Sequence, residues 1–289
     1  MKFCFKYLFG LFIIQTFINP LYLLANQEIK EFDNKQNKRS KVVALTSLSA
    51  DLVGNLSISS LVGMPGSSLF KNKKEFQNIP IVSRGRMQPD IEKIISLKPD
   101  YVIGAKGFHD KTLRKLKDLG ISTISTNIKS FKDLESFESQ LQKILVTKNK
   151  GILENNLKSC YLKIDSSRNN KNVLALVSVK PMLSPNSKSW SGSLIKRFGF
   201  NNLTADLPSQ GEFKGYLNIN QEWLLKNQPN NLLLVKTPGS SLDQYKSLTI
   251  WNKLSAVKNK KIFGFDYYGF INPGSLSSIN KACKKLSNI

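Results

Sequence analysis

The stretch PDIEKIISLKPDYVI at residues 89–103 decides the fold, because its pattern returns as NINQEWLLKNQPNNLL at residues 218–233. In each copy a glutamate, Glu92 or Glu222, precedes a proline by seven residues, and the two copies lie 130 residues apart. The glutamate suits the positive N-terminal end of a short helix, and the proline ends that helix before an apolar strand. Repeats this far apart predict two related domains, whereas the units of a solenoid recur about every 20–50 residues.

Strand and helix patterns alternate around both stretches. Short apolar runs rich in β-branched residues predict strands at residues 41–46, 101–104, 121–125, 173–177, 232–235 and 262–265. Helical patterns lie between them, as at residues 50–56 and 112–119. Alternation of this kind is typical of mainly parallel sheets. We therefore predict an α/β fold with two Rossmann-like lobes, each built around a central parallel sheet.

One long single helix is expected to join the two lobes. Residues 131–164 carry apolar side chains at helical spacing, first in a stripe through Leu134 and Leu141 and then in a second stripe through Leu153 and Leu157. A helical connection predicts a nearly fixed angle between the lobes and small closure movements. The predicted divisions are a signal peptide at 1–25, a flexible leader at 26–40, an N-terminal lobe at 41–130, a connecting helix at 131–170 and a C-terminal lobe at 171–289.

The first 25 residues have the features of an export signal. Lys2 and Lys6 form a positively charged region, an apolar stretch runs from Tyr7 to Phe17, and cleavage is expected near Ala25. Polar residues and a proline interrupt the apolar run, which is therefore shorter than the roughly 20 residues of a membrane span. Because no cysteine lies beside the cleavage site, we expect a soluble periplasmic protein and not a lipoprotein.

Composition disfavours several kinds of chemistry. The chain has one histidine, His109, and three cysteines, whereas zinc and copper sites draw several ligands from these two residue types. We expect no metal site, no cofactor and no enzymatic activity, because a nucleophilic mechanism would depend on His109 alone. Cys160 and Cys283 remain after export, and they could form a disulfide or stay as free thiols.

The net charge is strongly positive, at +23 from 43 Lys and Arg residues against 20 Asp and Glu residues. The lysines are spread along the whole chain, and no basic run is interleaved with the aromatic residues that stack on bases. We therefore expect no nucleic-acid partner. Basic loops instead favour an anionic ligand.

Further motifs along the chain are KVVALTSLSAD at 41–51, LVG at 61–63, LKPDYVI at 97–103, LGI at 119–121, WSGSLI at 190–195, NNL at 201–203 and LSAVKN at 254–259. In this order and spacing, they resemble the motifs of the periplasmic substrate-binding proteins for ferric siderophores, haem and cobalamin. The resemblance covers residues 41–287 and implies two α/β lobes that grip a chelate and then dock on an inner-membrane ABC permease. It further implies that Glu92 and Glu222 pair with arginines of that permease. We expect the protein to act as a monomer.

The ligand should lie beyond the carboxyl ends of the parallel strands, where open α/β sheets bind their ligands. Loops at these positions supply guanidinium groups for chelate oxygens and flat aromatic faces for packing. The expected ligand-binding residues are Arg84, Arg86, Phe108, Trp190, Tyr216, Tyr267 and Tyr268. The resemblance implies that Arg86 matches an arginine with which the hydroxamate-siderophore members hold the chelate oxygens.

Four aromatic positions keep alternatives open. Trp190 begins a helix and is either core or cleft wall. Tyr267 and Tyr268 are expected to alternate across a strand end, so that one faces the core and the other lines the cleft. His109 could be an axial ligand of haem or cobalamin, but a solvated residue at a helix start is the favoured interpretation.

These patterns predict a periplasmic solute-binding component of an ABC importer whose ligand is a metal chelate, with a ferric siderophore favoured. Haem and cobalamin are alternative ligands of the same class, and cobalamin is disfavoured because no Trp lies near Arg84. An exported two-lobe α/β enzyme is the alternative from a different class. It is the weaker hypothesis, because the acidic residues of the expected cleft loops show no spacing that suggests a catalytic pair.

Overall fold

Five parallel strands form the sheet of the N-terminal lobe, in the order β3-β2-β1-β4-β5. They are β1 (Val42–Ala44), β2 (Leu61–Gly66), β3 (Ile81–Arg84), β4 (Tyr101–Ala105) and β5 (Ser122–Thr126). The order reverses at β1, which pairs in parallel with β2 on one side and with β4 on the other. Parallel pairing brings all five carboxyl ends to one edge of the sheet, and ligands bind at such an edge in open α/β sheets.

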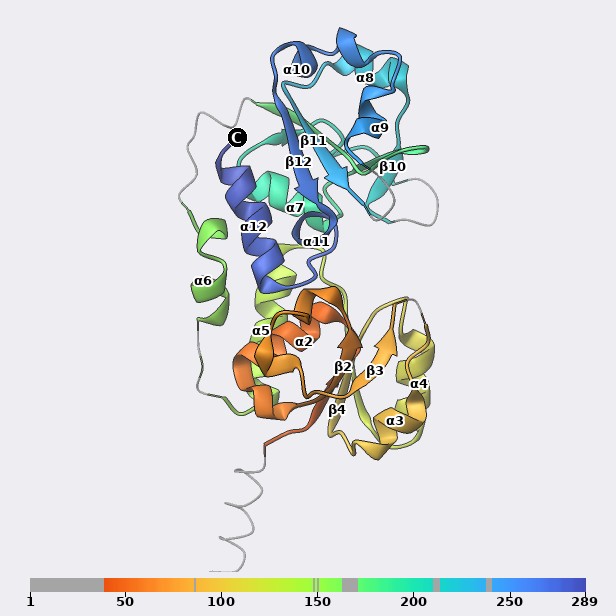
Figure 1. Cartoon of the computed structure of the whole chain (residues 1–289), viewed down its shortest axis with the longest axis vertical. Coiled ribbons are helices and arrows are strands. Elements are labelled where there is room, and N and C mark those ends of the chain that lie inside the picture. Colours follow the sequence, from red (N-terminus) through yellow and green to blue (C-terminus); the bar gives the residue numbers. More distant parts are fainter. Residues whose placement is uncertain are drawn as a thin grey trace, which may run out of the picture. The chain divides into compact units, whose positions relative to one another are not determined.

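The structure is a computed structural model of the chain, and it describes residues 39–85, 87–147, 149, 151–162, 171–209, 214–237 and 241–289. The predicted signal peptide at 1–25, and the predicted leader apart from its last two residues, lie outside the described residues. Residues Ser40–Ile289 form one unit that contains both lobes (Figure 1). No helix in the described part of the chain is long and apolar enough to cross a membrane.

The helices of the N-terminal lobe are α2 (Ser47–Ser57), α3 (Ile91–Ser96) and α4 (Asp110–Asp118), with 3-10 turns at Ile58–Ser60, Ser68–Phe70 and Lys74–Phe76. Side-chain caps begin α2 and α3, whereas α4 begins at His109 without one. The Thr46 hydroxyl accepts the N–H of Ser49 at the start of α2, and the Asp90 carboxylate accepts the N–H of Lys93 at the start of α3. These contacts satisfy N–H groups that a helix leaves unpaired at its first turn. The strands and helices that the sequence predicted in this lobe are confirmed.

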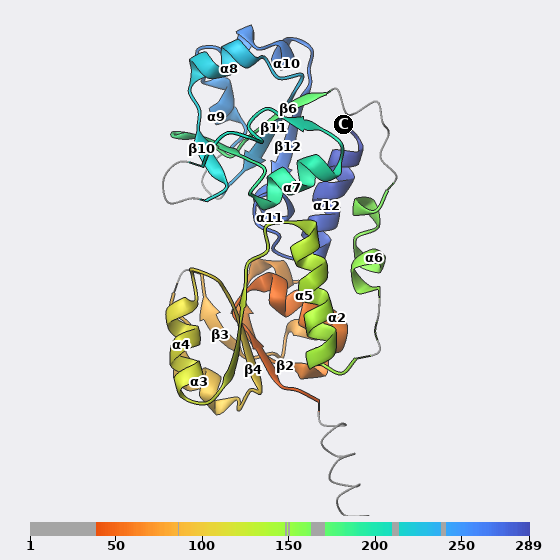
Figure 2. The same ribbon diagram turned by 180° about the vertical axis from the view of Figure 1, so that it is seen from behind.

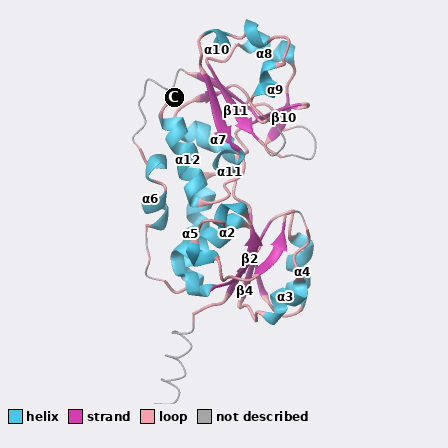
Figure 3. Cartoon of the chain, viewed as in Figure 1, coloured by secondary structure: helices cyan, strands magenta, loops and turns pink. Residues whose placement is uncertain are grey.

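The C-terminal lobe contains a four-stranded parallel sheet in the order β12-β11-β6-β9. Strands are drawn in magenta in Figure 3. Its strands are β6 (Asn172–Leu176), β9 (Asn201–Asn202), β11 (Asn231–Lys236) and β12 (Ile262–Asp266). A small antiparallel sheet, which the sequence pattern did not indicate, consists of β7 (Ser178–Val179), β8 (Met182–Pro185) and β10 (Tyr216–Asn218). The helices are α7 (Trp190–Arg197), α8 (Gln221–Asn227), α9 (Asp243–Lys246), α10 (Ser255–Lys258), α11 (Tyr267–Phe270) and α12 (Leu276–Ser287), with a 3-10 turn at Trp251–Lys253.

The duplication seen in the sequence extends to backbone conformation. Glu92 and Glu222 lie in the first turns of α3 and α8, as predicted, and both are exposed. Lys98 and Gln228, each directly before the proline of its copy, have positive φ angles of 47° and 35°. Since non-glycine residues rarely adopt this conformation, its occurrence at equivalent positions marks the two segments as copies of one structural unit.

A reciprocal pair of hydrogen bonds follows the proline in each copy. The Asp100 carboxylate accepts the N–H of Lys41 at 2.7 Å, and the Asp100 N–H donates to the Lys41 carbonyl at 2.8 Å. Asn230 holds Asn172 in the same two ways, at 2.9 and 3.0 Å. Each pair fixes the start of a central strand, β1 or β6, beside the strand that follows the proline.

The connection between the lobes is not the long single helix that the sequence predicted. It consists of α5 (Phe131–Ile144), α6 (Ile152–Asn156) and a 3-10 turn at Lys158–Cys160 (Figure 2). Val146 and Gly151 have φ angles of 47° and 71°, which end the first helix and precede the second. The two apolar stripes read from the sequence therefore belong to separate helices, and neither continues through the predicted connecting segment.

A continuous apolar core runs from one lobe into the other. Fully buried leucines from α2, α5 and α7 belong to one cluster with Ile279 of α12, and these leucines are Leu52, Leu134, Leu141 and Leu194. α5 packs against both α2 and α7, and α12 also contacts α2 directly. The lobes are thus joined by side-chain packing as well as by the covalent connection.

The open alternative for the cysteines is resolved in favour of a disulfide. Cys160 and Cys283 are bonded, with their Cα atoms 5.0 Å apart. Both residues are buried. The bond attaches the 3-10 turn after α6 to α12, and it closes a loop with a sequence separation of 123 residues.

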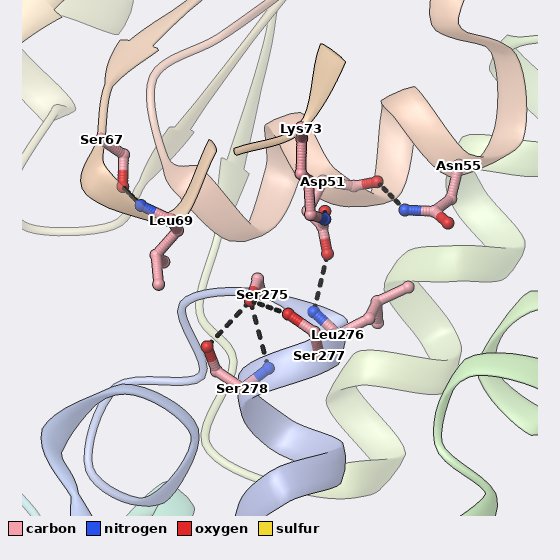
Figure 4. A network of polar contacts seen from close by, with 9 residues as sticks. All are labelled: Asp51, Asn55, Ser67, Leu69, Lys73, Ser275, Leu276, Ser277 and Ser278. Atoms are coloured by element: carbon pink, nitrogen blue, oxygen red, sulfur yellow. Dashed lines mark hydrogen bonds and ion pairs between the residues drawn. The ribbon is translucent and has the colours of Figure 1, made fainter. Parts of the chain in front are cut away.

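A polar network joins α2 to the start of α12 (Figure 4). Asp51 on α2 is fully buried, and its Oδ2 accepts the N–H of Leu276, the first residue of α12, at 2.7 Å. Its Oδ1 pairs with the ammonium group of Lys73. Ser275 caps α12 locally by accepting the N–H of Ser278. A carboxylate of the N-terminal lobe therefore completes the cap of a helix in the C-terminal lobe.

Candidate ligand-binding cavity

A cavity of about 930 Å³ lies where loops of the N-terminal lobe meet loops of the C-terminal lobe. All five strands of the N-terminal sheet are followed by residues that line it, among them Ser47 after β1, Ser67 after β2, Gly85 after β3, Lys106 after β4 and Asn127 after β5. This is the position expected from the rule that ligands bind beyond the carboxyl ends of parallel strands. The volume is in the range of small-molecule sites, which is about 300–1,000 Å³.

The charge of the cavity wall is one-sided. Lys106 contributes an ammonium group, and its backbone N–H is anchored to the carbonyl of Thr126 at 2.8 Å. Among the described residues that line the cavity, none is an aspartate or a glutamate. Hydroxyl and amide groups of serine, threonine, tyrosine and asparagine supply the other polar surface. A wall whose described residues include one cation, no carboxylate and several hydrogen-bonding groups suits an anionic ligand rich in oxygen atoms.

His109 lies at the start of α4, but it is buried and only 5% exposed. Its Nδ1 accepts the backbone N–H of Ala105 at 2.9 Å, and the backbone N–H of His109 donates to the Ala105 carbonyl. Burial lowers the pKa of the imidazole, while the nearby Asp110 carboxylate raises it by a smaller amount. The expectation of a solvated helix-start residue is therefore wrong, because the turn after β4 folds the ring back against the end of that strand.

Tyrosines dominate the part of the wall that comes from the C-terminal lobe. Tyr267 and Tyr268 both line the cavity, with their rings edge to face and 5.4 Å apart. Tyr267 also packs against the buried core cluster, whereas Tyr268 is 37% exposed, so the expected division into one core residue and one cleft residue holds in part, although both residues line the cavity. The pair follows β12, which ends at Asp266. Gly269, with a φ of 93°, interrupts α11 directly after them, so the regular alternation of a strand does not apply here.

Tyr216 begins β10 and also lines the cavity. Burial raises the pKa of its phenol to about 12, and the neighbouring Tyr267 adds to the increase while Ser191 opposes it. Tyr216 therefore stays neutral at physiological pH and offers a phenolic hydroxyl, not a phenolate, to a ligand. Phe108 lies on the opposite wall, is 59% exposed and packs its ring edge to face with that of His109.

Trp190 belongs to the core and is not among the residues that line the cavity. It is 3% exposed, and its indole Nε1 donates to the carbonyl of Gly269 at 2.9 Å. Its ring also stacks on that of Phe131, the first residue of α5. Of the two alternatives for Trp190, the structure supports the core. The side chain holds the kink of α11, next to the tyrosines that do line the cavity.

The structure does not bring Arg84 to the cavity. Arg84 is exposed at the end of β3, whereas Ser83 and Gly85 on either side of it line the cavity. Arg84 is the last residue of β3, and it is not among the residues that line the cavity. Arg86 lies outside the described residues, and its expected contact with the ligand stays a prediction.

The two glutamates of the duplicated segments lie apart from the cavity. Glu92 and Glu222 are exposed at the first turns of their helices and do not line it. No group of three or more His, Cys, Asp or Glu side chains gathers to hold a metal ion in the part of the chain that the structure describes. The described part of the cavity wall can bind a molecule through hydrogen bonds, the Lys106 cation and aromatic faces.

Comparison with known proteins agrees with this geometry. The family model described as "Periplasmic binding protein" matches residues 42–144. The chain is 26% identical over 264 residues to the Fe(3+)-citrate-binding protein YfmC of Bacillus subtilis, and the match covers 84% of this chain and 78% of that protein.

Solved structures extend the likeness to both lobes. An ABC transporter substrate-binding protein from Listeria monocytogenes has a TM-score of 0.66 at 23% identity, with 86% of this chain and 99% of that chain covered. The periplasmic heme binding protein HutB of Vibrio cholerae has a TM-score of 0.65 at 19% identity, with 87% and 97% covered. The predicted two-lobe α/β fold and the predicted resemblance to periplasmic substrate-binding proteins are confirmed.

Proposed function

We propose that this chain, whose fold is that of the substrate-binding proteins of ABC importers, captures an anionic ferric chelate in the cavity between its lobes and delivers it to a permease. The observation that carries the proposal is the charge of the cavity wall, where Lys106 stands without any carboxylate among the described lining residues. A ferric complex of a carboxylate or siderophore ligand presents oxygen atoms and negative charge to such a wall. The name of the YfmC relative, a ferric citrate-binding protein, supports this ligand class.

Lys106 provides the test of the proposed ligand class. Ferric citrate binding is measured by calorimetry for the mature protein, for Lys106→Ala and for Lys117→Ala, an exposed lysine of α4 that does not line the cavity. Both variants remove one positive charge, so a general effect of net charge cancels. We expect Lys106→Ala to bind about threefold to tenfold more weakly and Lys117→Ala to bind as the parent does. Equal affinities in all three proteins would remove the support that Lys106 gives to an anionic ligand.

The aromatic residues that line the cavity are proposed to pack against the chelate. Phe108 lies on the wall of the N-terminal lobe, and Tyr216, Tyr267 and Tyr268 lie on the wall of the C-terminal lobe. Phenolic hydroxyls can donate hydrogen bonds to chelate oxygens, and the aromatic faces can cover its organic part. Arg86 keeps its predicted role beside them.

Haem is the second candidate ligand, and the pair of tyrosine rings at Tyr267 and Tyr268 is the observation that favours it. Against it stands Tyr216, whose raised pKa opposes formation of an iron-binding phenolate. Cobalamin is the third candidate within the same class. We further propose that the protein has no catalytic activity, since the described cavity wall offers no pair of carboxylates for acid–base chemistry.

Delivery to the permease is proposed to use Glu92 and Glu222. Their support is symmetry, because the two carboxylates lie exposed at equivalent helix turns of the duplicated unit. The double variant Glu92→Ala/Glu222→Ala should bind the chelate normally but fail to support iron uptake in cells that depend on this protein. Glu75→Ala, at another exposed carboxylate of the N-terminal lobe, is the control and should support normal uptake. Normal uptake by the double variant would contradict the docking role.

The protein is proposed to act as a monomer in the periplasm after removal of residues 1–25. The support is the sequence itself, in which Lys2 and Lys6 accompany an apolar stretch and no cysteine lies beside Ala25. N-terminal sequencing of the exported protein should begin after Ala25. A lipid-modified N-terminus would contradict this part of the proposal.

A further inference from the structure

One polar group of the cavity wall, the imidazole of His109, is buried. We propose that His109 donates a hydrogen bond from Nε2 to an oxygen atom of the ligand, and that it thereby favours oxygen-rich ferric chelates and disfavours axial binding to a haem iron. This inference rests on the proposed function, and it assigns a specificity-determining residue within the same cavity.

The backbone fixes which ring nitrogen carries the proton. The N–H of Ala105, the last residue of β4, donates to Nδ1 at 2.9 Å. A donor can only be paired with a nitrogen that keeps its lone pair, so in the neutral ring the proton must lie on Nε2. The backbone N–H of His109 in turn donates to the Ala105 carbonyl at 2.9 Å. This second bond closes the turn and holds the ring against the strand end.

Packing leaves the ring little freedom. Gly104 of β4 makes room for it, because a Cβ at that position would lie only 2.8 Å from the Cβ of His109. The ring of Phe108 packs edge to face with the imidazole, at 4.8 Å between centroids. A side chain held in this way presents Nε2 in one direction, which reduces the entropy lost when a ligand binds.

Nε2 is available to a ligand. His109 lines the cavity, and within the described chain its side chain makes no hydrogen bond other than the one from Ala105. Burial keeps the ring neutral by lowering its pKa, so that the Nδ1 acceptor is retained near neutral pH. The wall therefore holds a neutral N–H donor close in sequence to the Lys106 cation, and both can serve the oxygen atoms of one anionic ligand.

Iron ligation would require the opposite tautomer. To bind a haem iron, Nε2 must offer a lone pair, and the proton would then move to Nδ1, where it would face the N–H of Ala105. Two donors facing each other in a buried turn would leave the Ala105 N–H without a partner, which is costly. An oxygen acceptor on the ligand requires no such change.

Because His109 is the only histidine of the chain, its state can be observed directly by NMR. Mature protein without an affinity tag is labelled with ¹⁵N-histidine and titrated with gallium citrate, a diamagnetic analogue of ferric citrate. We expect Nδ1 without a proton and Nε2 with a proton in the free protein, and a slower exchange of the Nε2 proton in the complex. A proton on Nδ1 in the free protein would overturn the inference.

Two substitutions separate the donor from the fold. Asn at position 109 can still accept the Ala105 N–H but has no donor at the Nε2 position, whereas Gln can place an amide N–H near it. We expect His109→Asn to weaken ferric citrate binding about tenfold, and His109→Gln to stay within about threefold of the parent, with unchanged circular dichroism for both. Equal binding by all three proteins would refute the role of His109 while leaving the proposed function intact. Failure of the parent to bind ferric citrate and a ferric hydroxamate would refute both.

Discussion

The carboxylate of Asp51 accepts the backbone N–H of Leu276 at 2.7 Å, across 225 residues of sequence (Figure 4). Asp51 lies on α2 of the N-terminal lobe, and Leu276 begins α12 of the C-terminal lobe. The contact lies in the apolar layer where these two helices meet, and Asp51 is fully buried. It therefore fixes the start of α12 relative to the sheet whose strands lead into most of the residues that line the cavity.

Removing this carboxylate should destabilise the protein. Asp51→Ala leaves the Leu276 N–H and the Lys73 ammonium group without their partner, and we expect the unfolding free energy to fall by about 2–3 kcal/mol. Asp51→Asn should lower the unfolding free energy less, because an amide oxygen can still accept the Leu276 N–H. Urea unfolding provides the measurement. The control is Asp243→Ala, which removes the exposed pair with Lys246 and should leave stability unchanged. Similar losses at both positions would contradict the account.

The disulfide should stabilise the mature protein by constraining its unfolded chain. It closes a loop of 123 residues between Cys160 and Cys283, and its reduction should lower the unfolding free energy by about 2–4 kcal/mol. Urea unfolding with and without a reductant measures this difference. The double variant Cys160→Ser/Cys283→Ser should have the unfolding free energy of the reduced parent, both with and without the reductant. Alkylation of two thiols in the native, non-reduced protein would show that the bond does not form.

Stability should depend on the protonation of His109. The pKa of the imidazole is lowered in the folded protein by burial, from an ordinary value of 6.5. Below about pH 6.5 the unfolded chain binds this proton more readily than the folded chain, so the unfolding free energy should fall as the pH falls. We expect the unfolding free energy to fall between about pH 7.5 and pH 5.5, and to fall less in His109→Asn. Identical pH profiles for parent and variant would contradict the burial of a neutral ring.

Gly269 should be intolerant of a side chain. Its φ is 93°, and a Cβ would collide with the backbone carbonyl of Ser278 on α12. We expect Gly269→Ala to cost about 2–4 kcal/mol of unfolding free energy and also to weaken ligand binding, since Tyr267 and Tyr268 directly precede it. Gly120→Ala is the matched control, with a φ of 81° but open space around the new methyl group, and should cost about 1 kcal/mol. Equal effects of the two substitutions would mean that the close packing of α11 on α12 is wrong.

The repeated pattern at Glu92 and Glu222 was enough to predict the two related lobes, because strand and helix periods and the helix-ending prolines are local properties. The left-handed conformations of Lys98 and Gln228 were not readable, since neither residue type favours a positive φ. The single connecting helix was wrong for a related reason. Apolar spacing predicted one helix across the whole segment, but the backbone turns at Val146 and Gly151 between its two stripes.

The position of the candidate site was predicted better than its side chains. The loops after the strands do line the cavity, and Phe108 and the tyrosines were found from them. Arg84 does not line the cavity, and the direction of a side chain at a strand end depends on register, which one sequence does not provide. Lys106 could have been singled out from its place directly after β4. The buried orientation of His109 could not be predicted from the sequence, because it depends on a hydrogen bond from the Ala105 N–H.

The most direct test of the account is an equilibrium titration of the mature protein with ferric citrate, a ferric hydroxamate, haemin and cyanocobalamin, followed by tryptophan fluorescence with correction for inner-filter absorption. Trp190 is a suitable reporter because its indole binds the Gly269 carbonyl, beside the cavity tyrosines. The account predicts saturable quenching by a ferric chelate, weakened in Lys106→Ala and not in Lys117→Ala. Saturable binding of haemin or cyanocobalamin alone, or of none of the four, would contradict it.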